Sequence, residues 1–179
     1  MKGENSNREN RVVINIGCGS RKGPGHIGLD RYRDSAADVL AELNRGLPFA
    51  TGSVDEIVAE HVLEHVPDLV ALMEEIYRVL APGGLLRLEV PYFAHPDAWR
   101  DPTHVRFFTW ESMDYFIDEM KPAVYTGVNF NYRHKELGFG DGLNSAIGKV
   151  LARLSIRRYE KYWSKSFPAR VLRAVLVRP

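Results

Sequence analysis

The sequence predicts an α/β fold in which a doubly wound, mostly parallel sheet carries helices on both faces. The run "RVVINIG" is rich in β-branched residues and ends on glycine, as buried parallel strands do. Further along, a segment with helical periodicity lies between two apolar runs, and a glycine-rich turn follows it. Strand, helix and strand with short joints form a βαβ unit, and the strands of such a unit are parallel.

Short apolar runs supply the other strands of the first half. "HIGLD" and "ADVLA" are the expected second and third strands, and "VDEIVAEH" follows the turn signal "ATGS" as the fourth. The helix opens near Pro67, a residue suited to a first turn, and ends at "APGG". "LLRLEVP" is then the fifth strand. The apolar face of the helix consists of Leu69, Leu72, Met73, Ile76, Val79 and Leu80.

The second half is aromatic and less regular after Pro91. We expect a helix from Thr109, a strand at "AVYTGVNFNY", a helix from about Asn144 and a closing strand at "ARVLRAVLV". These late strands are expected to complete the sheet. Residues 1–10 are polar and are expected to be a flexible lead, and residues 11–179 are expected to form a single domain.

Bulk charge gives no reason to expect a nucleic-acid or membrane partner. The chain has 24 Lys and Arg against 23 Asp and Glu, a formal net charge of +1. The single cysteine, Cys18, excludes an intramolecular disulfide and fits a reducing compartment. Neither a signal-peptide core nor an apolar run of about 18 residues occurs. We therefore expect a cytoplasmic location.

The glycines after the first strand indicate a small-molecule contact, because glycine accepts positive φ and lets a ligand approach the backbone. Their spacing, Gly17, Gly19 and Gly23, departs from the dinucleotide pattern G-x-G-x-x-G. Asp30 also follows sooner than the roughly 20 residues that such a site requires. A phosphate-binding G-x-x-x-x-G-K-[ST] loop is absent. A ligand with ribose and adenine but no phosphate fits better, and S-adenosylmethionine is such a ligand.

Several motifs occur together and in order. "INIGCGS", "IGLD", "ADVLAELNRGLPFATGSVDEIVAEHVLEHV" and "LMEEIYRVLAPGGLLRLEVP" resemble the class I S-adenosylmethionine-dependent methyltransferases, especially the type 11 group. The resemblance covers about residues 12–91 and extends loosely through "DPTHVRFFT". It implies a Rossmann-like fold with a seven-stranded sheet, here with a shortened first helix. Residues 11–91 would then be the cofactor-binding half, and residues 92–179 the substrate or lid half with the C-terminal strands.

The resemblance also assigns residues to S-adenosylmethionine. It implies backbone contact with the methionyl part, ribose recognition by Asp30, adenine recognition by Glu42 with Leu43, and contact with the amino group by Glu60 and His61. The methionyl contacts would come from Gly17, Cys18, Gly19 and Ser20. A turn glycine pair, a capping or turn aspartate and an exposed loop glutamate are the structural alternatives for these positions. Glu64 and His65 are taken as a capping and packing pair.

Methyl transfer needs little protein machinery, because the sulfonium already makes its methyl group electrophilic. A hydroxyl or protonated-amine acceptor benefits from a base, and imidazole suits that task near neutral pH. His95 and His104 follow the fifth strand and are the candidate catalytic bases, although each can equally be a turn or surface residue. A metal site built from His95, Asp97, Asp101 and His104 is considered and not expected.

Aromatic residues in the same segment have two interpretations. They either wall an apolar acceptor pocket or belong to the core beneath a lid, and the second use is expected for most of them. They are Tyr92, Phe93, Trp99, Phe107, Phe108 and Trp110.

The chain from Lys149 onward is strongly basic, with Glu160 as its single acid. Its helix is expected to place Ile147, Val150, Leu151 and Leu154 on one apolar face beside a solvated basic flank. A phosphate-binding surface is the alternative, and the acceptor would then be RNA or a phosphorylated metabolite.

The sequence thus predicts a methyltransferase that acts on an oxygen or nitrogen atom of a small molecule. A non-catalytic S-adenosylmethionine-binding protein, an RNA methyltransferase and an NAD-dependent oxidoreductase remain alternatives.

Overall fold

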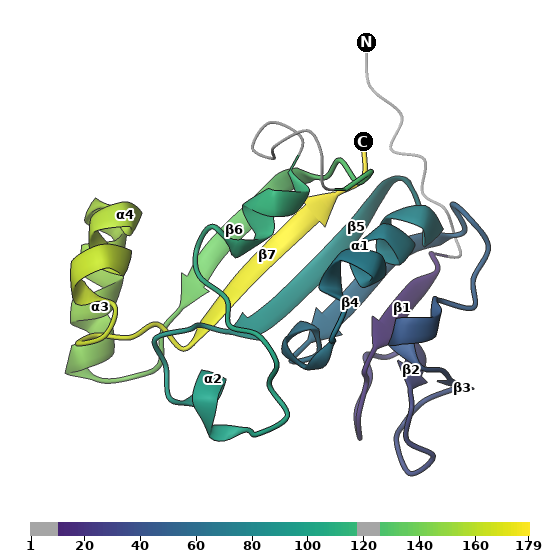
Figure 1. Ribbon diagram of the computed structural model, residues 1–179, viewed down its shortest axis with the longest axis horizontal. Helices are drawn as coiled ribbons and strands as arrows, with labels where there is room; N and C mark the ends of the chain where they lie inside the picture. Colours follow the sequence, from purple (N-terminus) through teal and green to yellow (C-terminus); the bar gives the residue numbers. More distant parts are fainter. Residues whose placement is uncertain (1–10, 118–125) are drawn as a thin grey trace.

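A seven-stranded mixed sheet forms the centre of the molecule. The computed structural model describes residues 11–117 and 126–179, and the expected N-terminal lead lies outside them. The strands lie in the order β3-β2-β1-β4-β5-β7-β6 (Figure 1). Neighbours from β3 to β5 pair in parallel, whereas β7 is antiparallel to both β5 and β6. The strands are β1 (Val13–Ile16), β2 (Ile27–Asp30), β3 (Val39–Leu40), β4 (Val54–Glu60), β5 (Leu80–Pro91), β6 (Asn131–Gly138) and β7 (Val171–Val177).

Helix α1 (Leu69–Val79) covers the sheet between β4 and β5, as predicted. Asp68 caps it by accepting a 2.9 Å hydrogen bond from the amide of Ala71. β5 begins directly at Leu80, because "APGG" forms an irregularity within the strand instead of a separate turn. The buried residues of α1 are Leu69, Leu72, Met73, Ile76 and Val79, which confirms the predicted apolar face. They pack on the β-branched and leucine side chains of β1, β4 and β5.

The other helical elements are short, apart from α3. They are η1 (Leu43–Arg45), η2 (Leu63–His65), α2 (Asp97–Arg100), η3 (Ser112–Phe116), α3 (Leu143–Leu154), α4 (Ile156–Arg158) and the π-helical η4 (Tyr159–Trp163). Among the described residues, no helix is both long and apolar enough to cross a bilayer. The cytoplasmic location remains a prediction.

The helical layers are smaller than the sequence predicts, although the fold class is confirmed. The expected short first helix is absent: residues 17–26, between β1 and β2, form turns. Side chains alternate along β5, so Leu86 and Leu88 enter the core under α1 while Arg87 points to the opposite face. The Arg87 side chain is 50% exposed there. In the described chain, that face therefore lacks the expected helical cover over the middle of β5.

The second half differs from the prediction in two places. The helix expected from Thr109 is only the 3-10 turn η3. The strand expected at "AVYTGVNFNY" falls partly on residues 118–125, outside the described residues, and β6 begins only at Asn131. The closing strand β7 is confirmed. These differences arise because tertiary contacts, which the local sequence does not specify, decide where short aromatic segments become strands.

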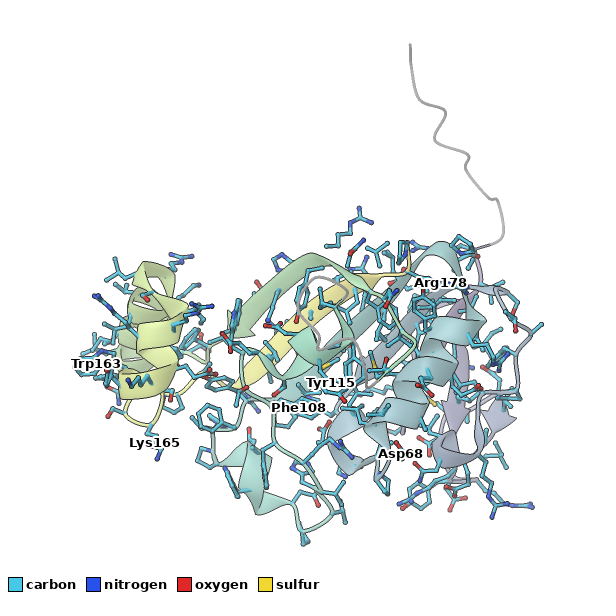
Figure 2. The ribbon with its side chains drawn as sticks, turned by 45° about the horizontal axis from the view of Figure 1, so that its top comes forward. Asp68, Phe108, Tyr115, Trp163, Lys165 and Arg178 are labelled. Carbon is cyan, nitrogen blue, oxygen red and sulfur yellow. The ribbon has the colours of Figure 1, made fainter. Side chains whose placement is uncertain are left out.

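Helix α3 forms as predicted, but its apolar face is mostly uncovered. Leu151 packs against a small cluster around Tyr92 and Tyr159, whereas Val150 and Leu154 are 55% and 78% exposed. The apolar face is therefore not buried at these two positions. The helix lies beyond the end of β6, so in the described chain the sheet does not cover this face (Figure 1). Figure 2 shows Trp163 and Lys165, which follow α3 and α4 in the chain, at the end of the molecule that lies away from the sheet.

Candidate functional site

A tight glycine turn follows β1. Gly17 and Gly19 have φ values of 59° and 53°, in the region that favours glycine. A Cβ at Gly17 would lie 2.4 Å from Cγ2 of Val62, so this position also has no room for a side chain. A Cβ at Gly19 would have no atom within 4 Å, so the surface there is open to an incoming group. The turn therefore exposes backbone at Gly19 and is packed at Gly17.

Asp30 links this turn to the end of β2. Its Oδ2 accepts a 2.8 Å hydrogen bond from the Gly19 amide, and its Oδ1 accepts one of 3.0 Å from the Tyr32 amide. The residue is 7% exposed. A carboxylate offers about four acceptor positions, so both oxygens retain capacity for further donors. Asp30 therefore stabilises the turn, as the structural alternative predicted, and it also keeps acceptor positions for a ligand.

A cavity of about 370 Å³ lies against the turn. Six of the residues predicted to bind the cofactor line it: Gly17, Gly19, Asp30, Glu42, Leu43 and His61. Cys18, Ser20 and Glu60 are not among its lining residues. Cys18 is buried, and burial raises the pKa of its thiol. The cavity is also lined by residues that the sequence analysis did not assign to a ligand: Arg31, Tyr32, Ala41, Asn44, Val62, His65, Val66 and Thr103.

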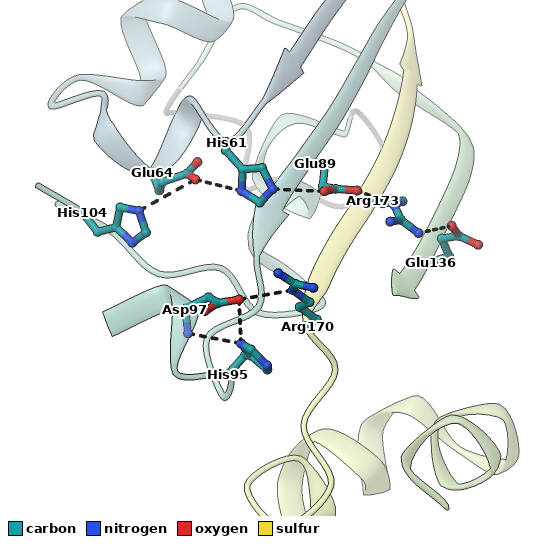
Figure 3. Close-up of polar contacts among 9 residues, drawn as sticks. All are labelled: His61, Glu64, Glu89, His95, Asp97, His104, Glu136, Arg170 and Arg173. Atoms are coloured by element: carbon teal, nitrogen blue, oxygen red, sulfur yellow. Dashed lines mark hydrogen bonds and ion pairs between the residues drawn. The ribbon is translucent and has the colours of Figure 1, made fainter. Parts of the chain in front are cut away.

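His61 turns the chain at the end of β4. Its φ of 54° is the only positive value at a non-glycine residue in the described chain. The ring lies between two carboxylates, with Nδ1 3.5 Å from Glu64 Oε1 and Nε2 3.1 Å from Glu89 Oε1 (Figure 3). The adjacent Glu64 carboxylate raises the pKa of His61, with a smaller contribution from Glu89, while partial burial opposes the rise. The imidazole of His61, which lines the cavity, is therefore protonated more readily than a free imidazole.

The predicted capping pair Glu64 and His65 belongs to a polar cluster with His104 instead, and Glu64 is its buried member. Glu64 is 1% exposed, and Oε1 lies 4.0 Å from His104 Nε2. His104 contacts the carbonyl of Ala98 through Nδ1 at 2.8 Å. His65 lies beside it, with ring centroids 4.7 Å apart. Sequence periodicity could not reveal this group, because its members meet only when residues 98–105 fold onto η2.

Residues 101–108 are anchored to η2 and the residues after it. The amide of Val105 donates to the Glu64 carbonyl at 2.9 Å. The guanidinium of Arg106 donates to the carbonyls of Val66 and Pro67, at 2.6 and 2.7 Å. Burial lowers the pKa of this guanidinium. Neither Arg106 nor Thr103 carried a role in the sequence analysis, and whether this segment covers an acceptor remains a prediction.

The two predicted catalytic histidines lie in different places. His95 pairs with Asp97 at 3.3 Å (Figure 3). It also lines a second cavity of about 500 Å³, together with Arg100 and Arg170. His104 lies beside Glu64. The four residues considered for a metal site are therefore divided between two regions, and Asp101 bonds to Thr103.

The aromatic segment contributes mostly to packing. Tyr92 and Phe108 are buried, and Trp99 stacks on Phe107 at the surface with centroids 3.7 Å apart. None of the six predicted aromatic residues lines either of the two cavities. The core interpretation therefore holds for Tyr92 and Phe108.

Comparison with known proteins agrees with this architecture. Residues 26–88 match a family described as a methyltransferase domain. An uncharacterized methyltransferase of Mycobacterium sp. (strain KMS) is 34% identical over 103 residues, which are 48% of this chain and 41% of that protein. The chain spans less than half the length of the first curated relatives that it matches.

Two solved structures share the fold. A S-adenosylmethionine-dependent methyltransferase from Archaeoglobus fulgidus has a TM-score of 0.61 and 18% identity, covering 93% of this chain and 86% of that one. A chain of the complex between the Haloferax volcanii Trm112 methyltransferase activator and a methyltransferase has a TM-score of 0.63 and 18% identity, covering 95% and 83%.

The fold defines a Rossmann-like α/β protein with its glycine turn and acidic residue at the ends of neighbouring strands. The match of residues 26–88 to the methyltransferase domain family, and the similarity to a probable S-adenosylmethionine-dependent methyltransferase of Mycolicibacterium smegmatis, relate this chain to the class I S-adenosylmethionine-dependent methyltransferases. S-adenosylmethionine is the cofactor of that class.

The cavity fits this cofactor by its chemistry. The open surface at Gly19 suits close approach of the methionyl part, and the acceptor capacity of Asp30 suits two ribose hydroxyls. Glu42 and the apolar Leu43 lie on the same cavity wall, where an adenine ring needs an acceptor and an apolar contact.

Proposed function

We propose that this chain transfers a methyl group from S-adenosylmethionine to an oxygen or nitrogen atom of a small-molecule acceptor in the cytoplasm. The observation that carries the proposal is one cavity lined by the cofactor-type residues Gly19, Asp30, Glu42 and His61 and also by the imidazole of His65. Cofactor-type and acceptor-type groups thus border the same space. The lone Cys18 supports the reducing location.

In this proposal the turn and its neighbours hold the cofactor. Gly17, Cys18, Gly19 and Ser20 lie along the methionyl part, although only the two glycines border the cavity. Asp30 accepts hydrogen bonds from the ribose hydroxyls, and Glu42 with Leu43 contacts adenine. The raised pKa of His61 favours a cation, so its ring suits the methionyl carboxylate better than the amino group. Glu60 is exposed and then serves the amino group only from the rim.

S-adenosylmethionine, when bound, supplies an electrophilic methyl group on its sulfonium. The chain's task is to orient the acceptor and exclude water, and Val62 and Val66 give the cavity apolar walls for that purpose. His104 is the proposed base, and its Nε2 takes the proton that the acceptor's hydroxyl or amine loses. His95 would be the base only if the acceptor extends into the second cavity. We place the acceptor beside His65, because His104 packs against that ring.

Calorimetric titration with S-adenosylmethionine, S-adenosylhomocysteine and NAD tests the cofactor. We expect micromolar binding of the first two, no binding of NAD, and a loss of about 10-fold or more in Asp30→Ala, because hydrogen bonds to a charged group contribute roughly 1.5–3 kcal/mol. Asp34→Ala removes a nearby exposed carboxylate outside the cavity and should bind normally. Binding of NAD, or of nothing, would overturn the proposal.

Turnover needs a separate measurement. S-adenosylhomocysteine formation against a panel of hydroxyl and amine acceptors should identify a substrate. Binding without turnover on any acceptor would favour a non-catalytic binding protein. An RNA acceptor would be indicated by substrate binding that weakens steeply with salt.

A further inference from the structure

Glu64 carries an unusual buried charge. Its side chain is 1% exposed, and no described residue makes a hydrogen bond with either carboxylate oxygen. His61 Nδ1, at 3.5 Å, lies at the outer limit of a polar contact. A buried carboxylate without donors costs several kcal/mol unless a cation compensates it. The carboxylate oxygens therefore retain acceptor capacity, and the imidazole of His61 is the nearest group in the described chain that can carry a compensating charge.

The neighbouring His104 is oriented for ligation. Its Nδ1 lies 2.8 Å from the carbonyl oxygen of Ala98, which can only accept, so Nδ1 carries the proton. In the neutral ring Nε2 then carries the lone pair, and this atom is the one that lies 4.0 Å from Glu64 Oε1. A backbone carbonyl that fixes the tautomer of an imidazole is the usual support of a metal-binding histidine.

His65 is oriented in the same way. The hydroxyl of Thr103 donates its proton to Asp101 Oδ1 at 2.7 Å, so this oxygen accepts from His65 Nδ1 at 2.9 Å. The carbonyl oxygen of Thr103 is also 3.3 Å from Nδ1. Both contacts place a proton on Nδ1, so the neutral ring has its lone pair on Nε2. Two imidazoles thus present lone pairs beside one buried carboxylate.

We propose that Glu64, His65 and His104 bind one divalent transition-metal ion, with Zn²⁺ as the best-fitting species. Each residue offers one ligand atom, and these atoms lie within 4.8 Å of one another. Metal–ligand distances of about 2.0–2.2 Å require them to move together by roughly 1 Å, which side-chain rotation can supply. Nitrogen donors favour such an ion over Mg²⁺ or Ca²⁺. Glu64 has two oxygens, so one can remain near His61.

Three protein ligands leave at least one coordination position open, as in catalytic zinc sites. His65 also lines the cavity beside Gly19 and Asp30, so the ion lies at the edge of the proposed cofactor site. While the ion is bound, His104 Nε2 is a ligand and no longer a proton acceptor. The site rests on its own contacts and does not require methyl transfer.

Metal binding by the full chain tests the proposal. After chelation and dialysis, calorimetry with Zn²⁺ and the visible absorption of Co²⁺ should report one ion per chain. Glu64→Gln and His104→Asn should each weaken Zn²⁺ binding by at least about 100-fold, because each removes a direct ligand. His134→Asn changes a histidine that is 57% exposed and pairs with Glu136, and it should bind as the wild type does.

A melting experiment separates loss of binding from loss of folding. Zn²⁺ should raise the Tm of the wild type and of His134→Asn but not that of Glu64→Gln, because a ligand stabilises only the state that binds it. Absence of one-to-one binding in the micromolar range, or equal affinity in Glu64→Gln and His134→Asn, would overturn the proposal. Titration with S-adenosylmethionine remains an independent test of the cofactor site.

Discussion

The carboxylate of Asp30 accepts a 2.8 Å hydrogen bond from the backbone amide of Gly19, so the end of β2 fixes the turn that follows β1. No helix lies between these two strands, so this hydrogen bond is a direct link that holds the turn after β1 to the end of β2. The geometry of the proposed cofactor site therefore depends on short-range contacts at the ends of two parallel strands.

Gly17→Ala should destabilise the protein by about 2–3 kcal/mol, because it combines a strained positive φ with overpacking against Val62. Gly52→Ala is the matched control, since Gly52 has a φ of 68° but no atom within 4 Å of the added Cβ. It should cost only about 1 kcal/mol from backbone strain. Urea unfolding of the three proteins measures both values, and equal losses would contradict the packing argument.

The Glu75–Arg78 pair on α1 should make stability depend on acid pH. The hydrogen bond from Arg78 lowers the pKa of Glu75 from its ordinary value of 4.5 to about 2. A lowered pKa contributes stability above the ordinary value, and this contribution is lost as the pH falls from about 4.5 to 2. Glu75→Gln should therefore be less stable by about 1–2 kcal/mol at pH 6, with the difference shrinking towards pH 2.5.

Melting curves across this pH range measure the effect. Glu74→Gln alters the neighbouring exposed carboxylate and should track the wild type at every pH. A difference between wild type and Glu75→Gln that does not change with pH would show that the pair is not ionised as described.

Arg106→Ala should release residues 101–108 from η2. The guanidinium donates to the carbonyls of both Val66 and Pro67, and these acceptors lose a charged donor in the variant. We expect a loss of about 2 kcal/mol and faster amide exchange at Val105. Arg100→Ala removes a guanidinium that is 77% exposed and should have little effect on that exchange. Unchanged exchange at Val105 in Arg106→Ala would argue against the anchoring role.

Glu160 should join the C-terminal helical segment to the end of the sheet. Its Oε1 accepts hydrogen bonds from the Tyr92 hydroxyl at 2.9 Å and from the Trp110 amide at 2.8 Å. Burial and the adjacent Glu160 raise the pKa of Tyr92, so its hydroxyl remains a donor. Glu160→Ala should cost about 2–3 kcal/mol, since it leaves these donors unsatisfied.

A double-mutant cycle with Tyr92→Phe isolates the pair, and we expect a coupling energy of about 1–2 kcal/mol. Glu111→Ala is the control, because Glu111 is 56% exposed and pairs with an exposed arginine. A coupling energy near zero would mean that Tyr92 and Glu160 act independently.

The sequence predicted the elements that local pattern controls. A β-branched run ending on glycine indicated β1, a short apolar run indicated β2, and the turn signal "ATGS" preceded β4. The spacing of Leu72, Met73 and Ile76 indicated α1. The motifs also predicted that Gly19, Asp30 and Glu42 belong to one site, because parallel strands end at a common edge. Residues that act through distant contacts carried no such signal. Arg106, Thr103 and Glu160 each form a hydrogen bond with a residue far away in the chain, and no sequence motif relates the two partners.

By itself, the sequence determined the type of sheet, the glycine turn with its acidic partner, and the central helix, because periodicity and turn residues act over a few positions. Only the tertiary structure decided that Glu64 is buried beside His65 and His104, that His95 lies in another cavity, and that α3 leaves Val150 and Leu154 exposed. Burial and side-chain direction depend on which distant segments pack together, and no local pattern encodes that choice.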